Sequence, residues 1–167
     1  METETDRLGN LAPVASELKG PHEVPMGDVA IDIKPGNEEN VVNPKSNGKL
    51  KVAILSAGKV KGDQIYYTFD APNQVDPKSL TFGLKGYEKS LASVQKQPQD
   101  FNGDGLDDLV CFFHTDKTQF EHYLSGKYKE TLGRLRGRYS DGTTGRGDRY
   151  LEFYAVDHIT VVPANAN

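Results

Sequence analysis

The stretch that decides the fold is DFNGDGLDDLVCFF, which covers residues 100–113. Its first nine residues carry four carboxylates, one amide and two glycines, and its last five residues are all apolar. An apolar run of this length without alternation is typical of a strand that is buried on both faces. We therefore expect a tight acidic loop that leads directly into a central strand, Leu109 to Phe113.

Short segments with strand character surround this central strand. The sequence has 17 glycines, contains Pro-Gly, Asn-Pro and Asn-Gly turn signals, and lacks long apolar stripes with a helical period. These features predict an all-β domain, and specifically an antiparallel Greek-key β-sandwich of immunoglobulin-like type. The other expected strands are 29–33, 50–55, 65–69, 80–82, 91–94, 120–124, 128–135, 150–156 and 159–162.

The length of 167 residues suits a single domain with additional terminal segments. Residues 1–28 are polar, contain three prolines, and are interpreted as an extended arm or linker. The sandwich is expected over residues 29–163, with a tail at 164–167. No apolar run approaches the roughly 18 residues that cross a bilayer, so we expect no membrane span.

Charge and cysteine content exclude some partners and sites. The formal net charge of −4 implies no general affinity for nucleic acid. The single cysteine, Cys111, rules out an intrachain disulfide and a zinc site built from several cysteines. Because Cys111 lies inside the apolar run, we expect its thiol to be buried and unreactive.

The acidic loop has the ligand spacing of a calcium site. Counted from Asp100, oxygen-bearing groups fall at positions one, three, five, seven and nine, with a glycine at position six. Oxygens at alternating positions of a tight loop converge on one point, and calcium takes about six to eight oxygen ligands. We therefore predict Ca²⁺ bound by Asp100, Asn102, Asp104, the Leu106 carbonyl and Asp108.

Other interpretations of the loop remain open. Unlike an EF-hand, the loop has Cys111 at position twelve instead of a glutamate, and a strand follows it instead of a helix. Any further ligand must come from elsewhere in the fold, with Asp70, Asp141 and Asp157 as candidates. The loop could also be an acidic surface turn without an ion. Magnesium is less favoured because it keeps several of its waters.

Taken alone, the loop resembles the FG-GAP repeats of integrin-like propellers, which read D-F-N-G-D-G-x-x-D-L. A propeller needs several copies of its repeat, and this sequence has one. The resemblance therefore stays local and does not extend to the propeller fold.

Four longer blocks follow one another in the order VAIDIKPGNEENVVNPKSNGKLKVAILSA (29–57), VDPKSLTFG (75–83), DFNGDGLDDLVCFFHT (100–115) and VDHITVVP (156–163). They are similar to the I-D-I-K-P-G, D-P-x-T-L-x-F-G, D-x-N-G-D-G-x-x-D-L-V and D-x-I-x-V-V segments of a calcium-binding β-sandwich module. That module occurs in bacterial and archaeal surface and secreted proteins, usually appended to a larger protein. The resemblance implies an all-β fold and a bound calcium ion, and it implies no catalytic chemistry.

The region from Lys127 to Arg149 is expected to form a basic hairpin, and its segment Gly133 to Asp148 is longer and more basic than the corresponding turn of the module. It reverses the charge of an otherwise acidic chain, which suits docking of an acidic partner, an anionic glycan or a lipid surface. The candidate partner-binding residues are Arg134, Arg136, Arg138, Arg146 and Arg149. Together with the arm they would contact a protein partner or a larger assembly. Alternatively, this is a solvated hairpin whose arginines pair with nearby acids.

The sequence contains no nucleophile elbow, P-loop, zinc-protease or dinucleotide-binding motif. Our main hypothesis is a non-enzymatic, calcium-stabilised structural or interaction module. A second is a carbohydrate-binding module with an aromatic face around Tyr150, Glu152 and Tyr154, and a third is a hydrolase that uses the acidic loop. The first residues, METETDRLGN, lack signal-peptide character. The expected extracellular, cell-surface or periplasmic location therefore rests on calcium and on the resemblance.

Overall fold

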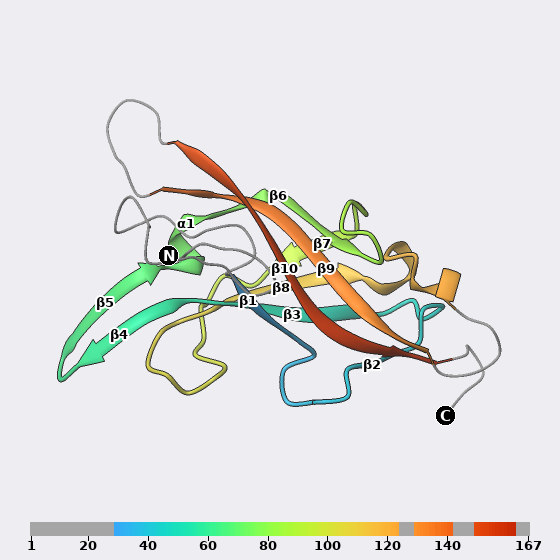
Figure 1. Cartoon of the computed structure of the whole chain (residues 1–167), viewed down its shortest axis with the longest axis horizontal. Coiled ribbons are helices and arrows are strands. Elements are labelled where there is room, and N and C mark those ends of the chain that lie inside the picture. The colour runs from blue at the N-terminus through green and yellow to red at the C-terminus, as the bar shows by residue number, and fades with distance from the viewer. Residues whose placement is uncertain (1–28, 124–128, 142–148, 163–167) are drawn as a thin grey trace, which may run out of the picture.

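The computed structural model describes residues 29–123, 129–141 and 149–162. In these residues two four-stranded sheets and one two-stranded sheet account for nearly all of the regular structure (Figure 1). The predicted all-β, sandwich-like fold is therefore confirmed. The expected arm (1–28) and tail (164–167) lie outside the described residues.

The first sheet contains the predicted central strand. Its order is β1-β3-β8-β7, and all of its pairs are antiparallel. The strands are β1 (Ala30–Ile33), β3 (Lys49–Leu55), β8 (Leu109–His114) and β7 (Leu91–Val94). Four of the first five residues of β8 are buried, which confirms a central strand covered on both faces.

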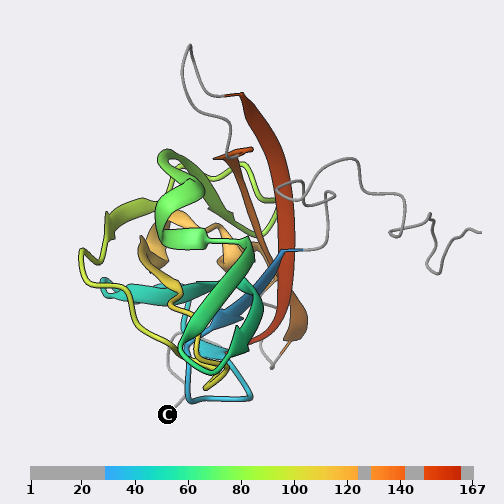
Figure 2. The same ribbon diagram turned by 90° about the vertical axis from the view of Figure 1, so that its left-hand side faces the viewer.

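The second sheet has the order β2-β10-β9-β6. Its strands are β2 (Val41–Val42), β10 (Tyr150–Val161), β9 (Lys129–Ser140) and β6 (Val75–Gly83). The long strands β9 and β10 pair antiparallel, as expected for a hairpin, whereas the short β2 runs parallel to β10. Figure 2 shows β10 (red) along one side of the molecule.

The core lies between the two sheets, because inward residues of both belong to one apolar cluster. Phe113 of β8 packs against Phe82 of β6 with ring centroids 4.9 Å apart, which links the two layers directly. Cys111 is fully buried, and this burial raises the pKa of its thiol to about 12. The expectation of a buried thiol is confirmed, and so high a pKa leaves almost no reactive thiolate at neutral pH.

A separate hairpin extends away from the sandwich, at the lower left of Figure 1. It consists of β4 (Ala57–Lys61) and β5 (Gln64–Phe69), and a short helix, α1 (Ala71–Gln74), follows it. All five residues of β4 are exposed, so this strand shows no alternation of apolar and polar residues and was not predicted.

One predicted strand and one predicted break between strands are wrong. Residues 120–124 were expected to form a strand, but Phe120–Tyr123 is a 3₁₀ helix that follows another 3₁₀ turn at Thr115–Lys117. Phe120 is buried against Phe82, at 6.0 Å between ring centroids, so its apolar character reflects one inward ring and not a strand. The expected break between 150–156 and 159–162 is also absent, because β10 runs continuously through the polar pair Asp157 and His158.

In the described residues, no helix is long and apolar enough to cross a membrane.

Candidate functional site

The acidic loop (residues 100–108) is closed at its base by backbone hydrogen bonds. Asp108 N donates to Gln99 O at 2.9 Å, and Gln99 N donates to Asp108 O at 3.3 Å. Within the loop, Gly103 and Gly105 have φ angles of 76° and 87°, a left-handed conformation that side-chain-bearing residues rarely adopt. The two glycines therefore permit the sharp turns that bring the loop back to the start of β8.

Backbone N–H groups hold the two outer carboxylates in place. Asp100 accepts hydrogen bonds from Gly103 N at 2.9 Å and from Gly105 N at 2.8 Å. These bonds, above all the one from Gly105, lower the pKa of the Asp100 carboxyl. Asp104 Oδ1 accepts from Leu106 N at 3.0 Å. Both carboxylates are thus oriented by the loop itself.

The Asn102 amide connects these carboxylates in one of two ways. With its oxygen directed towards them, that oxygen lies 2.9 Å from Asp104 Oδ1 and 3.0 Å from Asp100 Oδ1. With the amide turned over, its nitrogen donates to both oxygens at the same distances. The first arrangement gathers three oxygens at roughly the spacing of neighbouring ligands around an ion bound at about 2.3–2.6 Å. Asp100, Asn102 and Asp104 can therefore hold a hard cation in the first arrangement, whereas in the second they satisfy one another through hydrogen bonds.

Asp108 lies on the inner side of the loop and is 0 % exposed. Its Oδ1 accepts from Ser56 N at 2.9 Å, and its Oδ2 accepts from Phe101 N at 2.8 Å. Burial is the largest cause of the raised pKa of Asp108; the two hydrogen bonds oppose it, and the charges of Asp104 and Asp100 add to it. Asp108 joins the loop to the end of β3, and its role as an ion ligand stays a prediction.

The loop is also attached to the β4–β5 hairpin and to α1. Ser56 Oγ donates to Asp107 O at 2.6 Å and accepts from Ala71 N at 2.9 Å. A Cβ atom on Gly105 would stand only 2.9 Å from Val60 Cγ2, so the loop backbone approaches β4 closely. The position of the loop is therefore coupled to three neighbouring elements.

Side-chain carboxylates alone do not complete a metal site. Within the described ranges, no three His, Cys, Asp or Glu side chains form a group that could hold a metal ion. A cation at this loop must therefore use the Asn102 amide oxygen and backbone carbonyls. Of the further candidate ligands, Asp141 forms an ion pair with Arg149 at 3.1 Å, and Asp70 accepts a hydrogen bond from Asn73 Nδ2 at 2.9 Å.

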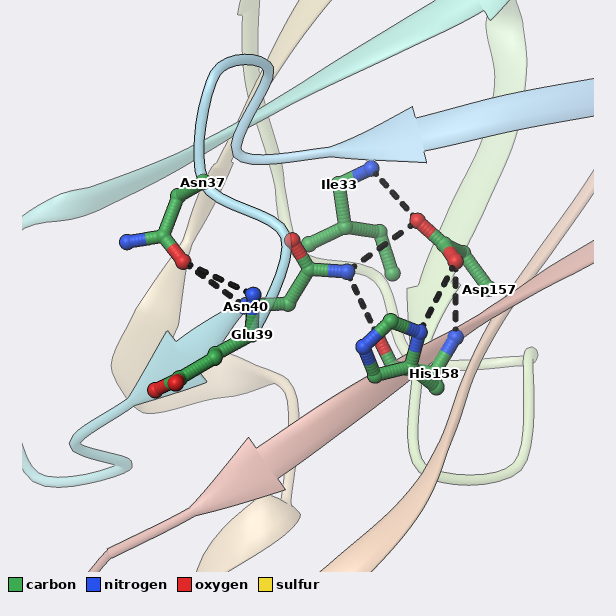
Figure 3. Close-up of polar contacts among 6 residues, drawn as sticks. All are labelled: Ile33, Asn37, Glu39, Asn40, Asp157 and His158. Atoms are coloured by element: carbon green, nitrogen blue, oxygen red, sulfur yellow. Dashed lines mark hydrogen bonds and ion pairs between the residues drawn. The ribbon is translucent and has the colours of Figure 1, made fainter.

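The third candidate, Asp157, belongs to a different polar cluster (Figure 3). Its Oδ2 accepts from Ile33 N at 3.0 Å and from Asn40 Nδ2 at 3.2 Å, and its Oδ1 lies 3.4 Å from His158 Nδ1. Asn40 is 2 % exposed, has a φ of 51°, and donates to His158 O at 2.7 Å. The cluster joins the end of β1 to β10, a role that the sequence did not indicate.

The predicted basic residues divide into separate groups. Arg134, Arg136 and Arg138 occupy alternate positions of β9, so they share the outer face of the second sheet. Arg149 is paired with Asp141, and Arg146 lies outside the described residues. We call the three β9 arginines and the tyrosines that stack on them (Tyr87, Tyr150 and Tyr154) the arginine face.

Comparison with protein-family models gives no match, and comparison with curated proteins gives no match either. The assignment of a function therefore depends on the geometry of the acidic loop and of the arginine face.

Proposed function

We propose that this chain is a non-enzymatic, calcium-binding β-sandwich that acts outside the cytoplasm. It serves as a structural or protein-interaction module, or as an accessory subunit of a larger surface assembly. The observation that carries the proposal is the convergence of Asp104 Oδ1 and Asp100 Oδ1 on one atom of the Asn102 amide, at 2.9 and 3.0 Å. Two carboxylates directed at one point repel each other unless the amide nitrogen or a cation lies there.

Calcium would be held by Asp100, Asn102 and Asp104, with the Leu106 carbonyl and Asp108 as the remaining predicted ligands. The bound ion supplies positive charge that offsets the mutual repulsion of the carboxylates. Because the ligands are brought together only in the folded chain, binding adds directly to the free energy of unfolding. The ion would thereby stabilise the junction between the loop, β8 and the end of β3.

A location outside the cytoplasm follows from the kind of site. Calcium sites of extracellular modules bind with dissociation constants of about 10⁻⁴–10⁻³ M. The acidic loop is largely exposed, and among the residues that the structure describes no carboxylate from another element completes it as a group of three. Such a site fits the weak class, which requires the abundant calcium found outside cells.

The geometry of the loop favours ligand and structural roles over acid–base catalysis. A general acid must be protonated near neutral pH, whereas the pKa of Asp100 is lowered by its backbone hydrogen bonds. Asp108 does have a raised pKa, but it is buried and both of its oxygens accept backbone N–H groups. The hydrolase hypothesis therefore gains no general acid from Asp100 or Asp108.

Isothermal titration with Ca²⁺ tests the proposal. We expect one ion per chain in the wild type and no detectable binding in Asp104→Ala, with Mg²⁺ binding more weakly. Asp116→Ala is a matched control, because Asp116 is an exposed carboxylate beyond the opposite end of β8 and should leave binding unchanged. Absence of binding in the wild type, or full binding in Asp104→Ala, would contradict the proposed site.

A further inference from the structure

The arginine face contains a groove that the calcium proposal does not use. The groove has a volume of about 390 Å³ and lies on the outer side of β6, β9 and β10. Its volume falls in the range of small-ligand sites, which begins at about 300 Å³. The lining side chains that matter here are Ser79, Thr81, Tyr87, Arg136, Arg138 and Glu152.

Arg136 is fixed at the centre of this groove. Its guanidinium carbon lies 4.4 Å from the ring centroid of Tyr87 and 4.5 Å from that of Tyr154. Tyr154 is its direct neighbour across the β9–β10 pair, and Tyr87 comes from the turn after β6. A guanidinium held by two rings loses little freedom when it binds a ligand.

The turn that carries Tyr87 is itself well anchored. The buried Glu88 carboxylate accepts Gly86 N at 2.8 Å and Lys85 N at 2.9 Å. Gly86 has a φ of 97°, and a Cβ atom there would stand 3.0 Å from Arg136 Nε. The turn backbone therefore rests on the arginine, which keeps both the guanidinium and Tyr87 in position.

Arg136 differs from the two neighbouring arginines, because each of them donates to an acceptor within the protein. Arg138 forms an ion pair with Asp76 at 2.8 Å, and Arg134 donates to Tyr154 Oη at 3.2 Å and to Leu84 O at 2.5 Å. Among the described residues, no carboxylate pairs with Arg136, and its buried Nε has no hydrogen-bond partner. Arg136 is therefore the arginine of this face whose charge is available to bind an external anion.

The remaining groups define the chemistry of the ligand. A planar guanidinium favours carboxylate or sulfate oxygens. Tyr87 is 68 % exposed and offers a flat ring surface to the apolar side of a sugar. Glu152 is exposed and stands opposite Arg138 across the β9–β10 pair, so it repels a second anion but accepts hydrogen bonds from hydroxyl groups. These groups together suit a ligand with one anionic group and several hydroxyls.

We propose that the arginine face binds an acidic saccharide. The anionic group of the sugar pairs with the terminal nitrogens of Arg136, the sugar ring packs on Tyr87, and a ring hydroxyl donates to Glu152. This binding does not depend on the acidic loop, so it goes beyond the calcium proposal and can fail or succeed separately from it. An acidic peptide satisfies Arg136 but gives Glu152 no hydroxyl and adds further negative charge beside it.

Titration with defined trisaccharides tests this proposal, in buffer with a chelator so that calcium cannot bridge the protein and the sugar. The probes are a trisaccharide with a single uronate, a trisaccharide with a single sulfate, a neutral trisaccharide and triglutamate, and binding is followed by NMR chemical shifts. We expect binding of the carboxylated or the sulfated sugar, and the stronger of the two identifies the anion. The neutral sugar and triglutamate are expected to bind at least about tenfold more weakly.

Variants assign the binding to the groove. Arg136→Gln should weaken binding by about tenfold or more, and Arg136→Lys should also weaken it because lysine keeps the charge but loses the planar stack. Tyr87→Ala, at an exposed turn position, should weaken binding about threefold or more without affecting the fold. Lys59→Gln on β4 removes one charge elsewhere and should bind like the wild type.

Three results would overturn the proposal. The first is that neither acidic sugar binds the wild type. The second is that triglutamate binds as tightly as the better sugar, which would indicate an acidic-peptide surface. The third is that Lys59→Gln and Arg136→Gln weaken binding equally, which would indicate attraction by net charge alone. A thermal unfolding midpoint close to that of the wild type checks that each variant is folded.

Discussion

The acidic loop and the arginine face both gather like charges, but they neutralise them differently. In the loop, side chains of a tight turn converge, and one atom of the Asn102 amide lies 2.9 Å from Asp104 Oδ1 and 3.0 Å from Asp100 Oδ1. On β9, alternate positions spread Arg134, Arg136 and Arg138 along a strand, and rings and acceptors from other strands fill the spaces between them.

The difference lies in how much space the backbone leaves between like charges. A strand separates side chains on one face by about two residue rises, roughly 6.6–6.8 Å, so neighbouring elements can enter between them. A tight loop leaves no such space, and we propose that a small cation neutralises its carboxylates. We therefore expect substitutions in the loop to depend on calcium and substitutions on the arginine face to be independent of it.

The largest expected effect in either region is that of Asp108→Ala. The change leaves Ser56 N and Phe101 N without their acceptor in a buried place, and we expect a loss of about 3 kcal/mol in the free energy of unfolding. Urea denaturation in the presence of a chelator measures it. The neighbouring exposed Asp107→Ala should change stability by no more than about 0.5 kcal/mol. Equal losses in both variants would show that Asp108 does not join the loop to β3.

A pair of glycine substitutions sharpens the description of the loop. Both Gly103→Ala and Gly105→Ala place a side chain at a positive φ, which costs roughly 1 kcal/mol. Nothing lies within 4 Å of a Cβ on Gly103, whereas a Cβ on Gly105 meets Val60 Cγ2 at 2.9 Å. We therefore expect about 2 kcal/mol for Gly105→Ala, measured by denaturant unfolding. Equal effects would mean that the β4–β5 hairpin does not restrain the loop.

The smallest expected effect lies on the arginine face. Tyr154→Phe removes the hydroxyl that accepts a hydrogen bond from Arg134 Nε but keeps the ring beside Arg136. We expect a loss of about 0.5 kcal/mol that is the same with and without calcium. Tyr66→Phe, at an exposed position on β5, serves as the control and should have no effect. A calcium-dependent loss in Tyr154→Phe would break the proposed independence of the two regions.

The parts of the fold that follow from local chemistry were predicted from the sequence. The apolar run from Leu109 to Phe113 predicts a strand buried on both faces, and the structure places this strand, β8, between β3 and β7. The secondary-structure prediction is wrong where tertiary packing overrides the local sequence pattern. Phe120 has the apolar character of a strand residue, but its ring is buried from a 3₁₀ helix.

The acidic loop and the arginine face also differ in how far the sequence predicts them. The spacing of Asp100, Asn102 and Asp104 within a few residues is enough to propose a cation site. In contrast, the sequence could place Arg136 only in a basic region. Its distinctive position arises because Tyr87 and Tyr154 come from separate elements and because Asp76, remote in the chain, neutralises Arg138 instead.

The most direct test of the account is thermal unfolding of the wild type, Asp104→Ala and Arg136→Gln, each with calcium and with a chelator. At a free calcium concentration of a hundred times the dissociation constant, binding should add about 2.7 kcal/mol to the free energy of unfolding. For a chain of this size the midpoint should rise by roughly 5–10 °C. We predict this rise in the wild type and in Arg136→Gln, and no rise in Asp104→Ala. No rise in the wild type, or an equal rise in Asp104→Ala, would contradict a calcium site in the acidic loop.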